Sequence, residues 1–369
     1  MEKLGTTSEA ILQALDRGES LPSVWYTDAA ITQRETERIF RNSWQYVGSL
    51  NQLAAVGDFV TAEVGGVPVV VVRTADRVSG LINVCRHRRH EVMKGCGNAK
   101  VLQCPYHAWT YDLNGILKAA PRADREPNFC VDDYPLLKLK VNTLGPWVFA
   151  NLDENSQPLS QYFGAVLDVI AGSGIDLNSM ELWSREQWQS DSNWKTMLEN
   201  FLECYHCQVA HPGFSAAVDV DQDNYQLTTH GYWFSQIGNV RSSAVAGLSK
   251  VEIYDVKGEI KQAQYHLLWP NFTININPGF PNISIDVWRP DGPNRTTGVS
   301  EQYFGPGVDK KWAEEVVRFN KAVGEEDDKL TNSVQRGLLA GMPAVGRSLI
   351  NSEHLMIEFQ KLVVKAICD

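Results

Sequence analysis

The chain has no excess of positive charge and no long hydrophobic run. Its 369 residues include 34 Lys and Arg against 44 Asp and Glu, which gives a formal net charge of −10 at pH 7. An acidic chain is repelled by nucleic acid and by anionic membranes, so neither is expected as a partner. The longest apolar run, from Val67 to Val72, suits a strand and is too short to cross a bilayer.

The first residues also lack the features of a targeting signal. Met1 to Thr7 contain no basic region followed by an apolar stretch, so a secretory signal peptide is not expected. The cysteine count of seven is odd and the chain is large, which argues against a disulfide framework and favours a reducing cytoplasm. The sequence also lacks internal repeats and low-complexity tracts.

Two short motifs stand out because each offers one thiolate and one imidazole. Cys85 and His87 are separated by one residue, and Cys104 and His107, which follow after sixteen intervening residues, are separated by two. A Rieske [2Fe–2S] centre requires two thiolates on one iron and two imidazoles on the other. A structural zinc is the alternative, but zinc sites prefer two to four residues between paired ligands. The spacing therefore favours the Rieske cluster.

The residues after the second motif extend the pattern. The run Cys-Pro-Tyr-His-x-Trp-x-Tyr-x-x-x-Gly, from Cys104 to Gly115, resembles the Rieske domain of Rieske-type non-haem iron oxygenases. His90 and Tyr106 stand where respiratory Rieske proteins carry an additional pair of cysteines, so the resemblance is to the soluble oxygenase or ferredoxin branch. Ala108 is a departure, because the family often has glycine there.

Arginines crowd the first loop, at positions 86, 88 and 89. They are interpreted either as a basic collar that docks an acidic electron donor or as a solvated turn whose arginines bind the surroundings of the cluster. The sequence leaves both readings open.

A second histidine pair follows later in the chain. His206 and His211 are five residues apart, which places them about 140° apart on an ideal helix, so a regular helix would not direct both at one ion. Pro212 is expected to end the helix there and to let His211 come from its frayed end. Two imidazoles need one carboxylate to complete the facial triad of a non-haem Fe(II) oxygenase.

Asp327 is the candidate carboxylate, on a helix predicted over residues 310–339. It falls on the apolar stripe of that helix, where a carboxylate is costly unless it is paired or binds metal. A helix-end charge or a buried salt bridge is the alternative. Glu325, Glu326 and Asp328 lie away from the stripe and are expected to be solvated. The stripe comprises Val316, Phe319, Val323, Leu330, Val334 and Leu338.

The resemblance now covers nearly the whole chain. The run from Asn200 to His211 is similar to the iron motif of Rieske oxygenase α subunits, and Glu326-Asp327 with Ser333 to Leu338 looks like their carboxylate-ligand helix. It implies that His206, His211 and Asp327 bind mononuclear iron.

The same resemblance implies that Glu203 is the acid that links a Rieske histidine of one subunit to the iron histidine of the next. Most members have aspartate there. Glu203 with the following Cys-Tyr-His-Cys also looks like the branch that acts on quaternary ammonium compounds such as carnitine, glycine betaine and choline. Cys204 and Cys207 are interpreted as small buried thiols rather than as a third metal site.

The pattern of elements predicts an α+β protein. Residues 1–40 are expected to be helical and to pack on the catalytic domain, residues 41–155 to form an all-β Rieske domain, and residues 156–369 to form a catalytic domain with an antiparallel sheet flanked by helices, of the helix-grip type. A Gly-Gly turn at Gly65 predicts a hairpin. Residues 272–276 and 283–287 alternate as a sheet with one wet face does, and a last helix is expected over 353–368.

The resemblance implies a terminal oxygenase. It would take electrons from an NAD(P)H-dependent reductase, directly or through a ferredoxin, and use O2 on a small organic substrate, within a cytoplasmic homotrimer. An aromatic ring-hydroxylating dioxygenase α subunit and an electron-transfer Rieske protein are the alternatives. A cationic substrate should lie among aromatic faces, for which the second half offers Tyr232, Trp233, Phe234, Tyr265, Trp269, Phe272, Phe280, Trp288, Tyr303 and Phe304.

Overall fold

The computed structural model describes residues 7–241 and 258–368 and divides the chain into two compact units. The smaller unit comprises residues 39–164, and the larger unit combines residues up to 38 with those from 165 onward. The smaller unit is therefore inserted into the chain of the larger one. Within the described parts of the chain, the structure contains no helix with the length and hydropathy needed to span a membrane.

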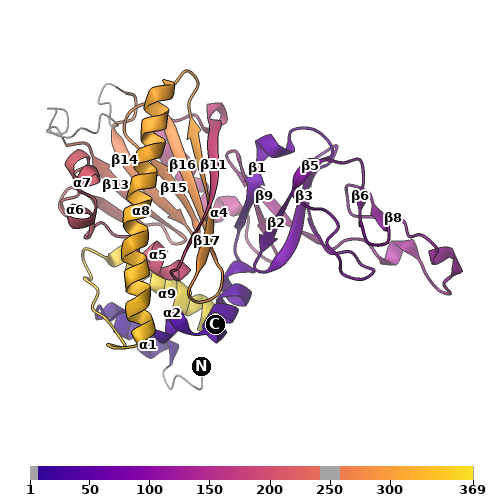
Figure 1. Ribbon diagram of the computed structural model, residues 1–369, viewed down its shortest axis with the longest axis horizontal. Helices are drawn as coiled ribbons and strands as arrows, with labels where there is room; N and C mark the ends of the chain where they lie inside the picture. Colours follow the sequence, from indigo (N-terminus) through magenta and orange to yellow (C-terminus); the bar gives the residue numbers. More distant parts are fainter. Residues whose placement is uncertain (1–6, 242–257, 369) are drawn as a thin grey trace. The chain divides into compact units, whose positions relative to one another are not determined.

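The smaller unit is built from antiparallel β-strands (Figure 1). Its strands are β1 (Gln45–Ser49), β2 (Asp58–Val64), β3 (Val67–Arg73), β4 (Val78–Ile82), β5 (Cys96–Asn98), β6 (Leu102–Gln103), β7 (Thr110–Tyr111), β8 (Leu117–Ala119), β9 (Lys138–Leu144) and β10 (Trp147–Asn151). Seven form a sheet of order β1-β10-β9-β4-β3-β2-β5, and β6-β7-β8 form a second sheet. Gly65 and Gly66 turn the predicted hairpin with positive φ angles, which glycine adopts without strain.

Strand β3 packs against apolar side chains on both of its faces. Val69 and Val71 belong to one buried cluster, whereas Val70 and Val72 belong to another that includes Cys85 and Cys104. Successive side chains of a strand point to opposite faces, so a run of valines serves both cores. The second core thus lies directly beneath the two Cys/His loops.

The larger unit contains a seven-stranded antiparallel sheet of order β11-β17-β16-β15-β14-β13-β12 (Figure 1). Its strands are β11 (Glu181–Ser190), β12 (Gln226–Thr229), β13 (Trp233–Asn239), β14 (Gln262–Leu268), β15 (Phe272–Ile276), β16 (Asn282–Pro290) and β17 (Thr296–Phe304). Ile274, Ile276, Ile283, Ile285 and Val287 are buried on one face. Polar side chains occupy the other, as the alternation predicts.

Helices cover the polar face and the lower end of this sheet. In Figure 1, α8 (Lys310–Ala340) runs across the sheet, with α5 (Trp194–Phe201) packed between them. Asp309 caps α8 by accepting a hydrogen bond from the backbone N–H of Trp312 (3.0 Å), and Gly341 ends it with a left-handed φ of 67°. The remaining long helices are α4 (Leu159–Gly172), which crosses the boundary between the units, and α9 (His354–Cys368).

Short N-terminal helices belong to the same unit. They are α1 (Ser8–Asp16), α2 (Val24–Thr27) and α3 (Ala29–Glu35), and a π-helical turn at Thr36–Phe40 follows across the boundary between the units. Asp28 caps α3, and its carboxylate accepts a hydrogen bond from the backbone N–H of Ala30 (2.7 Å). Helices α1 and α3 contact α9, and α2 contacts α8. Residues 1–6 of the expected helical segment, and most of the stretch without a targeting signal, lie outside the described residues.

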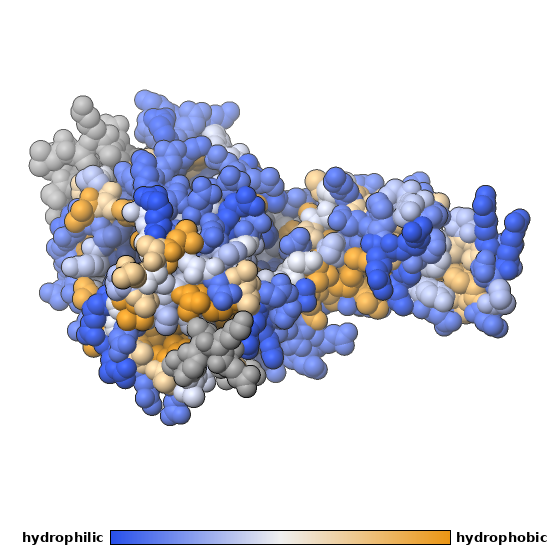
Figure 2. All heavy atoms as spheres, turned by 60° about the horizontal axis from the view of Figure 1, so that its bottom comes forward, coloured by the Kyte–Doolittle hydropathy of each residue, from blue (hydrophilic) through white to orange (hydrophobic). Residues whose placement is uncertain are grey.

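The predicted apolar stripe of α8 is only partly buried. Val316 is buried, but Leu330 and Val334 are 38% and 51% exposed, so the expectation of a continuous buried stripe is wrong. In this half of the helix the buried residues are polar: the Thr331 hydroxyl donates to carbonyls of its own helix, and Gln335 accepts from the backbone N–H of Asn193 at 2.9 Å. Figure 2 shows further apolar surface at the lower end of this unit, where the segment after α8 exposes Met342, Val345, Leu349 and Ile350.

Candidate metal centres and the adjoining cavity

The two Cys/His motifs form matching tight turns in the smaller unit. Cys85 and Cys104 are buried, and each backbone carbonyl accepts a hydrogen bond from the N–H four residues later, that of Arg89 or Ala108, both at 3.0 Å. Arg89 and Ala108 have φ angles of 58° and 57°, in the left-handed region that glycine adopts most readily. The left-handed φ angle explains why the family often has glycine at the position that Ala108 occupies in this chain.

The four predicted cluster ligands meet at these turns. The ring centroids of His87 and His107 are 4.6 Å apart, and His87 stacks on Trp109 at 5.2 Å. The Cys85 sulfur lies 3.4 Å from the hydroxyl of Tyr111. The thiols face the core and the imidazoles are exposed, so one pair of donors of each kind is available.

The surroundings of these ligands suit metal binding. Burial raises the pKa of the Cys104 thiol and nearby Cys85 adds to the effect, whereas backbone N–H groups of the same turn oppose it. Desolvation and the neighbouring His87 lower the pKa of His107, which keeps the imidazole neutral as a ligand must be. Two inward thiols and two exposed imidazoles fit a Rieske [2Fe–2S] cluster.

The arginines of the first loop are exposed. Arg86 donates to the carbonyl of Pro135 at 2.8 Å, and the Arg88 guanidinium lies 5.4 Å from the ring centroid of Tyr106. The first contact ties the loop to the segment before β9 and the second ties it to the other cluster loop, and both leave positive charge at the surface. The two interpretations of this loop therefore remain open.

The second histidine pair is positioned by a break in the helical chain. Helix α6 (Cys207–Ala210) is a single turn, with His206 at its N-cap and His211 at its C-cap. Pro212 does not end a longer helix but begins the next one, α7 (Pro212–Ala217). Because the chain changes direction at both histidines, their rings can face one point, which a regular helix would prevent.

Asp327 of α8 meets the two imidazoles. The Nε2 atoms of His206 and His211 are 3.1 Å apart, and Asp327 Oδ1 lies 3.5 Å from the first and 2.9 Å from the second. One ligand atom from each residue lies within 4.8 Å of the others. Two imidazole nitrogens and one carboxylate oxygen are the donor set of a facial triad. The structure thus brings together the three residues that the sequence singled out.

The protonation of these groups also favours a shared cation. Burial would raise the pKa of Asp327, but hydrogen bonds to both imidazoles lower it. Burial would lower the pKa of His206, but Asp327 and Glu203 together raise it to about 9. The carboxylate therefore draws positive charge to the point where the three side chains meet, and a divalent iron supplies such a charge.

The far nitrogen of each imidazole contacts a second acid. Glu203 binds Nδ1 of His206, and Glu326 Oε2 lies 2.7 Å from Nδ1 of His211. Such contacts fix the orientation of ligating rings. The expectation that Glu326 is only solvated is therefore wrong, although its side chain is 40% exposed. The contact of Glu326 could have been predicted from its position next to Asp327. Consecutive helix residues point about 100° apart, so the two acids can contact one imidazole ring from two sides.

Asn200 begins the iron motif but had no predicted role, and its Nδ2 lies 3.2 Å from Nε2 of His206. The contact of Glu203 with His206 lies within one chain. Its link to a Rieske histidine of a neighbouring subunit stays a prediction.

Cys204 and Cys207 form a disulfide across the start of α6. The interpretation of both as thiols is therefore wrong, whereas their expected burial is confirmed. Three positions along a turning chain bring their Cα atoms to 4.9 Å, which is within the span of a disulfide.

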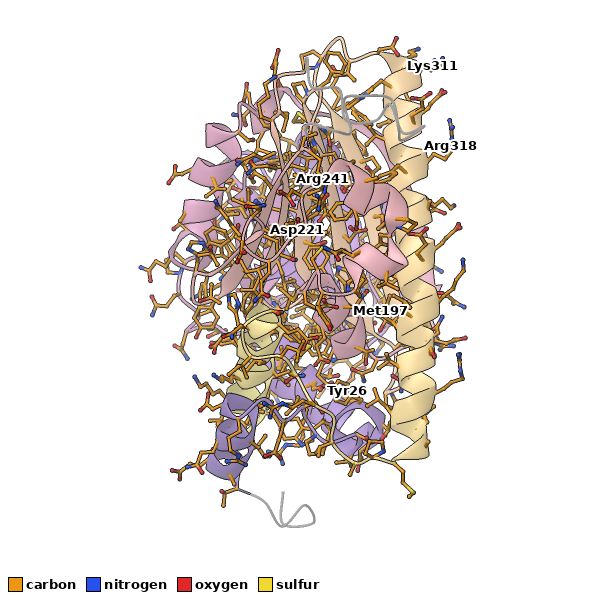
Figure 3. The ribbon with its side chains drawn as sticks, turned by 90° about the vertical axis from the view of Figure 1, so that its left-hand side faces the viewer. Tyr26, Met197, Asp221, Arg241, Lys311 and Arg318 are labelled. Carbon is orange, nitrogen blue, oxygen red and sulfur yellow. A yellow bond between two sulfur atoms is a disulfide. The ribbon has the colours of Figure 1, made fainter. Side chains whose placement is uncertain are left out.

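A cavity of about 590 Å³ adjoins the triad. The polar face of the sheet forms one wall, and α5 and α8 form the other. Figure 3 shows Met197 of α5, a lining residue, beside α8, whereas Lys311 and Arg318 project from the outer side of α8. Of the ten aromatic residues considered from the sequence, Tyr265 and Trp288 line the cavity; Trp188, Phe201, Phe214, Tyr225 and Phe319 were missed.

Comparisons with known families assign both units. Residues 43–137 match the Rieske [2Fe-2S] domain, and residues 179–368 match the catalytic domain of the ring hydroxylating alpha subunit. The oxygenase subunit of carnitine monooxygenase from Acinetobacter pittii (strain PHEA-2) is 32% identical over 94% of each chain. Chloroplastic choline monooxygenase from Atriplex hortensis is 32% identical over 86% of this chain and 71% of its own.

Solved structures agree with this assignment. The quaternary ammonium Rieske monooxygenase CntA, in complex with L-carnitine, superimposes with a TM-score of 0.79 at 30% identity over 94% of this chain and 95% of its own. Naphthalene 1,2-dioxygenase from Rhodococcus sp. superimposes with a TM-score of 0.76 at 18% identity over 97% and 98%. The latter similarity shows the fold alone. The predicted α+β fold, with an all-β Rieske domain before a sheet-and-helix catalytic domain, is confirmed.

Proposed function

The chain belongs to the Rieske-type oxygenases that carry the catalytic domain of ring-hydroxylating α subunits, and from this premise we propose that it hydroxylates a small quaternary ammonium compound. The convergence of His206, His211 and Asp327 on a cavity inside the catalytic unit is the observation that carries the proposal. The carnitine and choline monooxygenases among its relatives support the substrate class. An electron-transfer protein without a second metal centre would not require these three side chains to converge on a cavity, which argues against that alternative.

The roles of the site residues follow from their geometry. Cys85, Cys104, His87 and His107 would hold the [2Fe–2S] cluster, and His206, His211 and Asp327 would hold one ferrous ion. When bound, the cluster supplies single electrons and the ferrous ion supplies the place where O2 is activated.

The protein's own groups prepare this site. Glu203 and Glu326 fix the two imidazole rings, so that Nε2 of each faces the ion. The cavity walls separate the substrate from bulk water and place its C–H bonds beside the triad. Asn200, which contacts His206, is positioned to limit where the ring can move.

The reaction balances with two external electrons. Substrate, O2, two electrons and two protons yield a hydroxylated substrate and water. When the hydroxyl is placed on a carbon next to the quaternary nitrogen, the resulting carbinolamine breaks its C–N bond and releases an aldehyde and a tertiary amine. The electrons come from NAD(P)H through a reductase, directly or by way of a ferredoxin.

We further propose a homotrimer located in the cytoplasm. The solved structure of a relative, a quaternary ammonium Rieske monooxygenase, has given insights into inter-subunit electron transfer in that protein. An equivalent route here would run from a Rieske histidine of one subunit through Glu203 to His206 of the next. A reductase that uses NAD(P)H is a cytoplasmic partner, which supports the location.

A substrate screen tests the proposed function. Reduced, iron-loaded protein is expected to consume O2 with carnitine, choline or glycine betaine analogues and to release an aldehyde in equal amount. Product analysis separates this outcome from the aromatic alternative, because an arene converted to a cis-diol, without C–N cleavage of any amine, would contradict the proposal.

A further inference from the structure

The polar face of the catalytic sheet arranges its side chains in rows that cross the strands. One row joins Trp188, Gly298 and Trp288, and the next joins Glu186, Ser300 and Asp286. Residues directly opposite in neighbouring strands share a face. All of these except Gly298 line the cavity, so an acid and two indoles lie in adjacent rows of one wall.

Asp286 is an acid that faces the cavity without a cationic partner. Its carboxylate accepts hydrogen bonds from Ser300 Oγ and, at 3.0 Å, from Asn275 Nδ2, and forms no ion pair with any described residue. Burial raises the pKa of its carboxyl, and the hydrogen bonds offset only part of that increase. Burying a carboxylate is costly unless a positive charge lies beside it. The donors engage lone pairs on both oxygens, so what remains unmet is mainly charge.

The two indoles are brought together by the missing side chain of Gly298. Trp188 and Trp288 meet edge to face, with ring centroids 4.9 Å apart. A Cβ on Gly298 would lie 2.0 Å from the Trp188 ring, so no larger residue fits between them. Trp188 Nε1 donates to Ser300 Oγ at 2.9 Å, and Ser300 donates to Asp286. One chain of hydrogen bonds therefore fixes the first indole to the acid.

This wall lies under the helix that carries the metal-site acid. Asn320 of α8 donates to Gln302 of β17 at 3.2 Å, and Asp327 follows two turns later on the same helix. Gln302 is the cavity-facing neighbour of Ser300 along its strand. The acid, the indoles and the triad thus border one continuous space.

We infer that Asp286, Trp188 and Trp288 form the subsite that binds the cationic head of the substrate. A quaternary ammonium group carries charge but donates no hydrogen bond, which matches an acid whose hydrogen-bond needs are already met. Aromatic faces attract such a group through their quadrupoles. The inference rests on the function proposed above, because it assumes that the molecule oxidised in this cavity is a cation.

Binding to the iron-loaded protein tests the subsite. The probes are tetramethylammonium and choline, with neutral 3,3-dimethyl-1-butanol as the uncharged analogue of choline, and affinity is measured by calorimetry and by quenching of tryptophan fluorescence. Asp286→Asn is expected to weaken binding of both cations by about tenfold or more while changing binding of the neutral alcohol less than about twofold. Equal losses for charged and neutral probes would overturn the inference.

Two further variants keep the test specific. Glu186→Gln removes the same charge from an exposed acid at the cavity that is already paired with Lys321 (3.0 Å), and should leave cation binding nearly unchanged. Trp188→Phe should bind cations more tightly than Trp188→Leu, and an unchanged content of mononuclear iron shows that the catalytic unit of each variant is folded. If Trp188→Leu binds cations as well as the parent does, the indoles have no such role.

The outcomes also separate the subsite from the reaction. Selective loss of cation binding in Asp286→Asn, in a protein that never hydroxylates a quaternary amine, would support the subsite and refute the proposed function. Cleavage of choline by Asp286→Asn with an unchanged KM would refute the subsite and leave the function standing.

Discussion

Asp327 combines several roles at the catalytic cavity. It reaches Nε2 of both histidines, it is ionised by their hydrogen bonds, and it projects from a long helix that other contacts hold over the sheet. Its neighbour Asp328 also lines the cavity but accepts a hydrogen bond from Asn332 (2.8 Å) instead of contacting the imidazoles. The two adjacent aspartates therefore have different roles, so a substitution of Asp328 is a suitable control for the same substitution of Asp327.

Asp327→Ala is expected to remove the mononuclear iron and to abolish turnover. The loss of one of three ligand atoms leaves two imidazoles that cannot hold a ferrous ion against solvent. Iron analysis should fall from about three to about two per chain, because the Rieske cluster retains its pair, and the cluster spectrum should be unchanged. Asp328→Ala should keep all of the iron. Retention of turnover in Asp327→Ala would contradict the ligand assignment.

Where ligand type and spacing decide, the sequence singled out residues that the structure brings together, and it failed where the neighbours of a residue decide its contacts. The cluster and triad residues follow from the donors that each centre requires. Glu326, Trp188 and the pairing of Cys204 with Cys207 depend on which side chains the folded chain brings together. Only the rows of the sheet reveal that Trp188 shares a wall with Trp288.

Among the elements, α3 and α5 are joined by a fully buried ion pair. Glu35, at the end of α3, binds Lys195 of α5 and accepts from Trp194 Nε1 at 2.8 Å, and both charged side chains are 0% exposed. The Lys195 ammonium also lies 5.1 Å from the ring centroid of Tyr26. Helix α5 ends just before Glu203 and His206, so this pair anchors the element that leads into the metal site.

Glu35→Gln is expected to destabilise the catalytic unit strongly. The substitution leaves the ammonium of Lys195 buried without a counter-charge, which typically costs about 3–5 kcal/mol. Thermal and urea unfolding of the iron-loaded protein measure the effect. Glu9→Gln, at an exposed acid of α1, serves as the control and should change stability by less than about 0.5 kcal/mol. Equal stability of the two variants would show that the pair is not a structural anchor.

The elements themselves were largely predictable. The alternation over residues 272–276 and 283–287 reappears as β15 and β16, and the hairpin at Gly65-Gly66 and the helix from 310 are present. Local periodicity carries that information. Periodicity does not show which surface a helix packs against. Leu330 and Val334 were therefore predicted to be buried, although the second half of α8 leaves them exposed.

The two metal centres lie in different units of the molecule. Each unit contains its own candidate ligands, with the thiols packed on the core of the smaller unit and the triad on the cavity of the larger. Activity therefore depends on a route for electrons between them. Glu203, already bound to His206, is the proposed end of that route.

Glu203→Gln is expected to keep both metals yet slow electron transfer to the mononuclear site by at least about tenfold. The amide preserves length but loses the charge that binds an imidazole N–H at each end. Reoxidation of the reduced cluster in a single turnover is the measurement. Glu326→Gln removes the matching acid from His211 and should leave that rate unchanged in iron-loaded chains. An unaltered rate in Glu203→Gln would argue against the bridge.

The order of the chain through the two units matters to anyone who would dissect the protein. A fragment that starts at residue 165 discards α1 to α3 together with the cluster loops, and with them the carboxylate that neutralises Lys195. Isolation of the catalytic unit would require residue 38 to be joined to residue 165 through a linking peptide, as when a guest domain is excised from its host. Family relatives could then donate their own electron-carrying inserts at the same two junctions.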